Sequence, residues 1–166
     1  MTFNWSGDNS ASARKVAAQE LMTKISKNLK PGEPLNVVAH SHGGNVVKEY
    51  TQLPGAKKID TAVNLATPQR DDHKMNMKNV GAYINAYSNN DSIQNNGGPF
   101  YDSPLWGEYG FAGRTDSQAT NVEASTAKFP RPRGNPRTVT RNIGHSEMHS
   151  PSVWQQYLDP AIQANP

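Results

Sequence analysis

The chain has 166 residues, of which 34% are hydrophobic, and a formal net charge of +3. This length suits one domain with a single core and argues against two independent domains. The absence of cysteine excludes disulfides, thiol catalysis and cysteine-bound zinc. No apolar run approaches the roughly 18 residues of a membrane-spanning helix. We expect no export signal within the chain, and its location stays open.

The first half of the chain alternates between helical and strand patterns. Apolar residues at helical spacing predict an amphipathic helix over Ser10–Leu29 and a second helix from Gly44 to Pro54. Three short runs have the composition of strands: Leu35–His40, Asp60–Leu65 and Ala82–Tyr87. Helices that alternate with buried strands predict an α/β fold, with a mostly parallel sheet of about four or five strands flanked by helices.

The second half has weaker patterns. Asn, Gly, Pro, Ser and Asp dominate after Asn89, which predicts an irregular insertion or lid over about residues 92–137. The aromatic residues between Phe100 and Phe111 suit either an apolar wall over a substrate or ordinary core packing. Thr138–Ile143 reads as a final strand, and a terminal helix follows Pro151. We therefore expect a single domain over residues 1–166.

A basic stretch precedes the last predicted strand. Its arginines are Arg131, Arg133, Arg137 and Arg141. Proline and glycine interrupt this stretch, and no aromatic residues are interleaved with it, which favours a solvated loop over a nucleic-acid-binding surface. We expect no nucleic-acid partner. A basic protein that binds lipid or nucleic acid remains the least favoured function, and it predicts binding that weakens steeply with salt.

The strongest local pattern surrounds Ser41. An apolar strand leads into Ala39-His40-Ser41-His42-Gly43 and a helix follows, which is the arrangement of a nucleophile elbow with Ala39 in place of the usual first glycine. Strand and helix approach closely at such a turn, so the positions two before and two after the serine must lack bulky side chains. The turn exposes the hydroxyl beside free backbone N–H groups of the helix. The alternative is a strand-to-helix turn without catalysis.

A serine nucleophile needs an imidazole to take its proton and a carboxylate to orient that imidazole. In α/β-hydrolases the acid and then the histidine follow the serine along the chain. Asp91 follows the strand predicted to end at Tyr87, and His145 follows the strand predicted to end at Ile143. Other residues remain alternatives: Asp71, Asp72, Asp102 and Asp116 for the acid, and His149 for the base. We expect His40 and His149 at the pocket or its rim. The spacing of His145 and His149 does not suit zinc, and no metal or organic cofactor is implied.

These patterns resemble the small bacterial triacylglycerol lipases of the lipase A type. The matching blocks are Leu35–Tyr50, Ala62–Arg70, Tyr83–Ile93 and Asn142–Val153. The sequence is also similar to the hydrolase domains of some RHS-repeat polymorphic toxins. The resemblance implies an α/β-hydrolase in which Ser41, Asp91 and His145 form the triad and the backbone N–H of His42 belongs to the oxyanion hole. It implies hydrolysis of lipid, phospholipid or small carboxylic esters through an acyl-enzyme, contact with a membrane surface, and, from the second likeness, an exported bacterial effector.

One departure from this family concerns the oxyanion hole. In the family an earlier strand ends in a His-Gly-rich loop that supplies the second donor, whereas Thr2–Gly7 resembles the segment after that strand. We expect a truncated α/β-hydrolase fold with an exposed sheet edge, completed by a missing N-terminal segment or by another chain. A substitute donor from Asn4, Ser6 or near Gly7 is a further expectation, since losing one donor typically costs on the order of 10²–10³ in kcat. The alternative function is an inactive fragment that acts as an interaction module.

Overall fold

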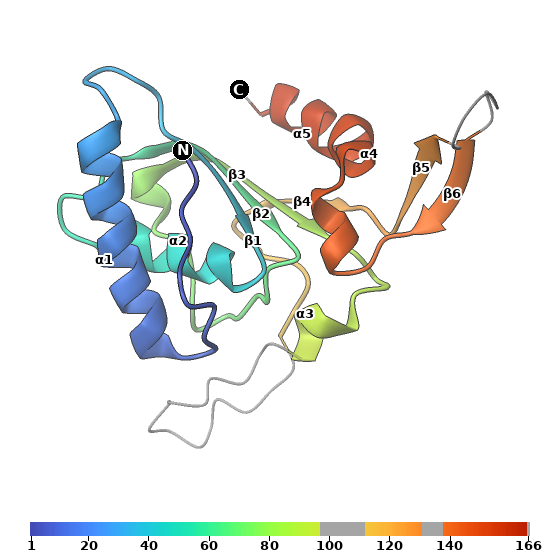
Figure 1. The fold of residues 1–166 in the computed structure, drawn as a ribbon, viewed down its shortest axis with the longest axis horizontal. Helices are drawn as coiled ribbons and strands as arrows, with labels where there is room; N and C mark the ends of the chain where they lie inside the picture. Colours follow the sequence, from blue (N-terminus) through green and yellow to red (C-terminus); the bar gives the residue numbers. More distant parts are fainter. Residues whose placement is uncertain (97–111, 131–137, 166) are drawn as a thin grey trace.

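A four-stranded parallel sheet forms the centre of the molecule. The computed structural model describes residues 1–96, 112–130 and 138–165. The strands of the sheet are β1 (Asn36–His40), β2 (Ile59–Leu65), β3 (Val80–Tyr87) and β4 (Thr120–Glu123), in the spatial order β1-β2-β3-β4. All three neighbouring pairs are parallel. The carboxyl ends of the strands therefore lie at one edge of the sheet (Figure 1).

Helices cover both faces of this sheet (Figure 1). The helices on one face are α1 (Ala11–Asn28) and α2 (His42–Gln52). The C-terminal helical turns on the other face are η3 (Ser146–His149), α4 (Pro151–Val153), the π-helical turn η4 (Trp154–Leu158) and α5 (Asp159–Gln163). Two short elements lie in the connections, η1 (Met77–Asn79) and α3 (Ser92–Asn96). The fold is thus α/β, as the sequence predicts.

The sequence explains why α1 forms where it does. The Ser10 side chain caps the helix by accepting a hydrogen bond from the backbone N–H of Ala13 at 3.1 Å. Residues four apart then line one buried stripe, represented by Ala17, Leu21 and Ile25. The observed bounds differ by one residue at each end from the predicted helix.

Two apolar clusters divide the core between the two faces. The first joins α1 and α2 to one side of the sheet through residues such as Leu21, Val47 and Tyr83. The second joins the other side to the C-terminal helices through residues such as Leu65 and Leu158. Because side chains alternate along each strand, both faces of β2 and β3 are buried. The sheet therefore has the burial of a typical parallel α/β layer.

The second half of the chain contains more regular structure than its sequence predicts. β4 and β5 (Thr126–Pro130) lie within the stretch expected to be irregular, so that expectation was wrong for the described part of it. β4 is an edge strand with mostly exposed side chains, which is why it shows no hydrophobic alternation. The predicted strand that begins at Thr138 exists as β6 (Thr138–Asn142), and it pairs with β5 in a separate antiparallel sheet.

Several sequence expectations fall outside the described residues. They concern the aromatic residues between Phe100 and Phe111 and three of the arginines, Arg131, Arg133 and Arg137. The fourth arginine, Arg141, lies exposed on β6 with its guanidinium 5.4 Å from the ring centre of Phe129. Among the described helices, none is both long and apolar enough to cross a membrane.

Candidate active site

Ser41 occupies a sharp turn between β1 and α2. Its backbone angles are φ 55° and ψ −135°, and a positive φ is uncommon for a residue other than glycine. Such a conformation costs on the order of 1–3 kcal/mol and persists only where neighbours hold it. Two hydrogen bonds hold it here, from Ser41 N to Leu65 O at 2.8 Å and from Gly44 N to Ser41 O at 3.0 Å. The turn is the strained strand-to-helix geometry that the sequence predicts.

The close approach of strand and helix is tightest at Gly44 rather than at Gly43. A Cβ on Gly44 would lie 2.2 Å from Oγ1 of Thr67 and 2.8 Å from Cγ of Asn64, which is sterically impossible without movement. A Cβ on Gly43 would meet only the Cβ of Ala39, at an ordinary 3.8 Å. A Cβ alone would therefore fit at the position two after the serine, and the expectation that this position must lack a bulky side chain stays a prediction. The next position, Gly44, cannot hold even a Cβ, because α2 packs against the end of β2 there.

Three side chains from distant parts of the chain meet at the carboxyl edge of the sheet. Nε2 of His145 lies 2.9 Å from Oγ of Ser41, and Nδ1 of His145 lies 2.7 Å from Oδ2 of Asp91. The Asp91 side chain is fully buried, whereas the His145 side chain is 11% exposed. The arrangement can therefore pass a proton from a hydroxyl to an imidazole whose far nitrogen is held by a carboxylate.

The loop that carries Asp91 is fixed by hydrogen bonds to its backbone. The second carboxylate oxygen, Oδ1, accepts from the N–H of Gln94 at 2.9 Å, so both oxygens of Asp91 have partners. Arg114 donates from Nε to Ser88 O and from Nη2 to Asp91 O, both at 2.9 Å. One guanidinium thus spans the acid loop from the end of β3 to Asp91. Sequence reasoning missed Arg114, because its acceptors are carbonyl groups that leave no trace in the sequence.

The loop that carries His145 is fixed in the same way. Nε2 of His40 lies 2.9 Å from the backbone oxygen of His145 and donates to it, since a carbonyl can only accept. The Ser88 hydroxyl donates to the backbone oxygen of Ile143. Burial lowers the pKa of His40 despite its bond to that carbonyl, and this favours a neutral ring. His40 therefore holds the backbone of His145 in place, a role that the sequence did not reveal.

His149 lies at the rim of this cluster. Its ring centre is 5.5 Å from that of His40, and the two rings meet edge to face. Among the described residues, neither Ser41 nor Asp91 makes a hydrogen bond to His149. The structure thus brings His145, and not His149, between Ser41 and Asp91.

The alternative acids have partners elsewhere. Asp71 pairs with Lys74 at 3.0 Å, and Asp72 pairs with Arg70 at 2.6 Å. The buried Asp116 lies 3.3 Å from Nζ of Lys48. Burial acts to raise the pKa of Asp116, but the Lys48 charge, the hydrogen bond from the Gln118 backbone and the contact with Lys74 together outweigh it and leave the pKa lowered. Asp102 lies outside the described residues.

The amino end of α2 offers one backbone donor beside Ser41. Within the described residues no acceptor binds the N–H of His42, as is usual for the first N–H groups of a helix. No hydrogen bond joins Asn4 or Ser6 to Ser41 in that same part of the chain, and Ser6 Oγ instead accepts from Asp8 N. The substitute donor from Asn4, Ser6 or near Gly7 stays a prediction.

The His42 side chain is an acceptor. Nδ2 of Asn45 lies 3.3 Å from Nδ1 of His42, so that nitrogen carries no proton. Burial, with smaller effects from the Arg14 and His145 charges, lowers the pKa of His42 to about 4. The ring beside the nucleophile is therefore neutral near pH 7.

Across residues 1–96, 112–130 and 138–165, no three His, Cys, Asp or Glu side chains are grouped closely enough to hold a metal ion. Comparison of the chain with family models, with curated proteins and with solved structures found no match. Any function must therefore be argued from the geometry of the site.

Proposed function

We propose that this chain is a serine hydrolase that cleaves carboxylic esters through a triad of Ser41, His145 and Asp91. The observation that supports the proposal is the pair of hydrogen bonds that joins the three side chains, at 2.9 Å and 2.7 Å. The positive φ of Ser41 adds to it, because strained serine turns of this kind present a nucleophile at the end of a strand. Esters of lipids, phospholipids or small acids are the proposed substrates, with contact at a membrane surface.

The proposed mechanism follows from the contacts. Oγ of Ser41 attacks the ester carbonyl while its proton passes to Nε2 of His145, and Asp91 stabilises the resulting imidazolium through Nδ1. The N–H of His42 donates to the oxyanion. The imidazolium then gives its proton to the leaving alcohol as the acyl-enzyme forms. Water, deprotonated by His145, releases the acid and restores Ser41.

The test is hydrolysis of p-nitrophenyl esters of short and long acids by the purified chain. Wild-type turnover that Ser41→Ala abolishes would support the proposal. A fluorophosphonate probe that labels the wild type, but neither Ser41→Ala nor His145→Ala, would show that the serine is activated. Labelling that survives His145→Ala, or turnover that survives Ser41→Ala, would refute it.

The second candidate is an interaction module without catalysis. Two observations favour it: β1 is an open edge of the sheet, and the N–H of His42 is one donor where an oxyanion hole normally has two. In that case neither the wild type nor Ser41→Ala would hydrolyse any ester or react with the probe.

A further inference from the structure

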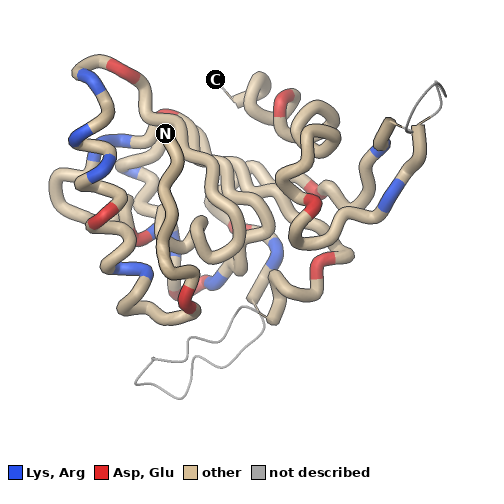
Figure 2. Tube along the Cα trace, in the orientation of Figure 1, with Lys and Arg blue, Asp and Glu red and all other residues tan. Residues whose placement is uncertain are grey.

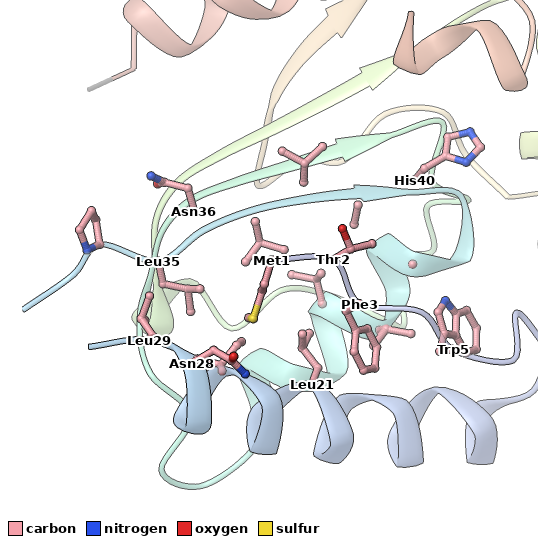
Figure 3. Close-up of a pocket in the computed structure, with 18 of the residues that line it drawn as sticks. Met1, Thr2, Phe3, Trp5, Leu21, Asn28, Leu29, Leu35, Asn36 and His40 are labelled. Atoms are coloured by element: carbon pink, nitrogen blue, oxygen red, sulfur yellow. The ribbon is translucent and has the colours of Figure 1, made fainter. Parts of the chain in front are cut away.

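A cavity runs along the free edge of the sheet. Its volume is about 760 Å³, and it lies between β1 and the N-terminal segment Met1–Trp5 (Figure 3). We call this space the edge cleft. Its apolar floor comes from α1 and α2, through Leu21, Ile25, Val46 and Val47. His40 and Gly43 line it too, so one end of the cleft lies beside Ser41.

One wall of the cleft is a strand edge without a partner. Hydrogen bonds from Ser41 N to Leu65 O and from Asp60 N to Leu35 O show which residues of β1 face β2. Because backbone groups alternate along a strand, those of Asn36, Val38 and His40 face the open side. In the part of the chain that the structure describes, nothing bonds to them. The Val38 side chain is also 53% exposed, which is unusual for a valine in a parallel sheet.

The opposite wall is an extended segment that has strand-like alternation. Phe3 and Trp5 pack against the core, whereas Thr2 and Asn4 are exposed. Lys24 holds this segment on α1 by donating to the backbone oxygen of Thr2 at 2.5 Å. The segment runs in the same direction as β1, from Met1 to Trp5 (Figure 3). Among the described residues, no hydrogen bond joins it to β1.

We propose that the edge cleft receives a β-strand from polypeptide outside residues 1–166. Such a strand would pair with the free edge of β1 and place alternate apolar side chains on the floor formed by α1 and α2. An alkyl chain would cover the floor but leave the backbone groups of Asn36, Val38 and His40 without partners. Only a peptide can cover the apolar floor and also form hydrogen bonds with the free edge of β1.

The charges around the edge cleft indicate which kind of strand it would bind. Neither Met1–Trp5 nor β1 contains Asp, Glu, Lys or Arg, and both are drawn without charge colours in Figure 2. Glu33, beside the start of β1, is the one charged side chain among the described residues that line the cleft, so an apolar strand fits it better than a charged one. A second copy is a poorer donor, because the free edge of its own β1 faces its own Met1–Trp5 segment across the cleft, and the Phe3 and Trp5 of that segment are packed on its own core.

The experiment measures amide hydrogen exchange in the Ser41→Ala protein, so that binding is read separately from hydrolysis. The probe is a short peptide in which valine alternates with threonine, added free and also joined to the amino terminus through a Gly/Ser linker that raises its effective concentration. We expect it to slow exchange at Val38 and His40 by about tenfold or more. The same peptide with N-methyl groups along one edge, which keeps its side chains, is expected to have no effect.

A matched pair of variants tests the role of the strand edge. Val38→Pro removes the outward N–H without removing a bond to β2, and is expected to abolish protection at His40. Val38→Thr keeps that N–H and is expected to retain protection. Unchanged exchange with both the free and the joined peptide would overturn the proposal. Equal protection by a long-chain fatty acid would assign the cleft to lipid, and protection that rises with protein concentration alone would assign it to a second copy.

Discussion

The carboxyl edge of the sheet and its open side edge are built in opposite ways. At the carboxyl edge, both oxygens of Asp91, both ring nitrogens of His145 and the carbonyl of His145 have hydrogen-bond partners. Along the side edge, the outward backbone groups of β1 face a cavity of about 760 Å³. The difference teaches that the chain by itself specifies the arrangement of the reacting groups but not the closure of its sheet.

The largest expected effect concerns the hydrogen-bonded groups at the carboxyl edge of the sheet. Asp91→Asn keeps the shape of the acid but stabilises the wrong tautomer of His145, so ester turnover is expected to fall by roughly 10⁴. Steady-state kinetics with a p-nitrophenyl ester measures it. Asp72→Asn, which removes the charge of a carboxylate that is 46% exposed and pairs with Arg70, is the control and is expected to leave turnover unchanged. Equal losses in the two variants would contradict the assignment of the acid.

A smaller effect is expected when the acid loop is loosened. Arg114→Lys replaces the planar guanidinium by a single ammonium group, which cannot donate to the Ser88 and Asp91 carbonyls in the same geometry. Hydrogen bonds from charged groups contribute about 1.5–3 kcal/mol each. We expect kcat to fall by about 10- to 100-fold with KM unchanged. Arg70→Lys serves as the control. A change in KM alone, or a lower melting temperature with full kcat, would show that Arg114 does not position the acid.

The turn at Ser41 is tested by two glycine substitutions that differ by one position. Gly44→Ala forces a Cβ into Thr67 and is expected to lower the free energy of unfolding by about 1–3 kcal/mol. Gly43→Ala makes an ordinary contact and is expected to be neutral, or stabilising by up to about 1 kcal/mol through helix propensity. Urea unfolding of both proteins measures the difference. The reverse order of stabilities would mean that α2 does not approach β2 as described.

The last expected effect concerns the response of stability to acid. The pKa of His42 is about 4 in the folded protein, below the unfolded value of 6.5. Between these two pH values the ring is protonated in the unfolded chain but not in the folded one. The free energy of unfolding is therefore expected to fall as pH drops from about 6.5 to about 4. His42→Gln removes this ring but keeps the backbone N–H, and should flatten that part of the profile. A parallel profile in the variant would assign the acid sensitivity to other groups.

The sequence predicted the parts of the molecule that have a repeating or local signal. α1 was predicted to within one residue at each end, because its apolar spacing and Ser10 cap are local. The order in which Ser41, Asp91 and His145 follow three strands was enough to predict which of them the fold brings together. Apolar spacing, helix caps and the order of residues along the chain can all be read directly from the sequence.

The remaining features depend on contacts that no local pattern encodes. β4 was missed because an exposed polar edge strand has no hydrophobic alternation. Arg114 and His40 act on backbone carbonyls, which every residue possesses, so their partners could not be inferred from residue type. The side chain at position 44 is limited by Thr67, in the loop that follows β2, and only the packing of α2 against the end of β2 reveals this limit.

The long separation of His145 from Ser41 along the chain has a consequence for synthesis. The base reaches Ser41 only after β6 and the turn that follows it have formed, 104 residues downstream of the nucleophile. A nascent chain therefore carries an unactivated serine until these 104 residues have been made, and the proposed hydrolysis cannot begin before His145 has been translated.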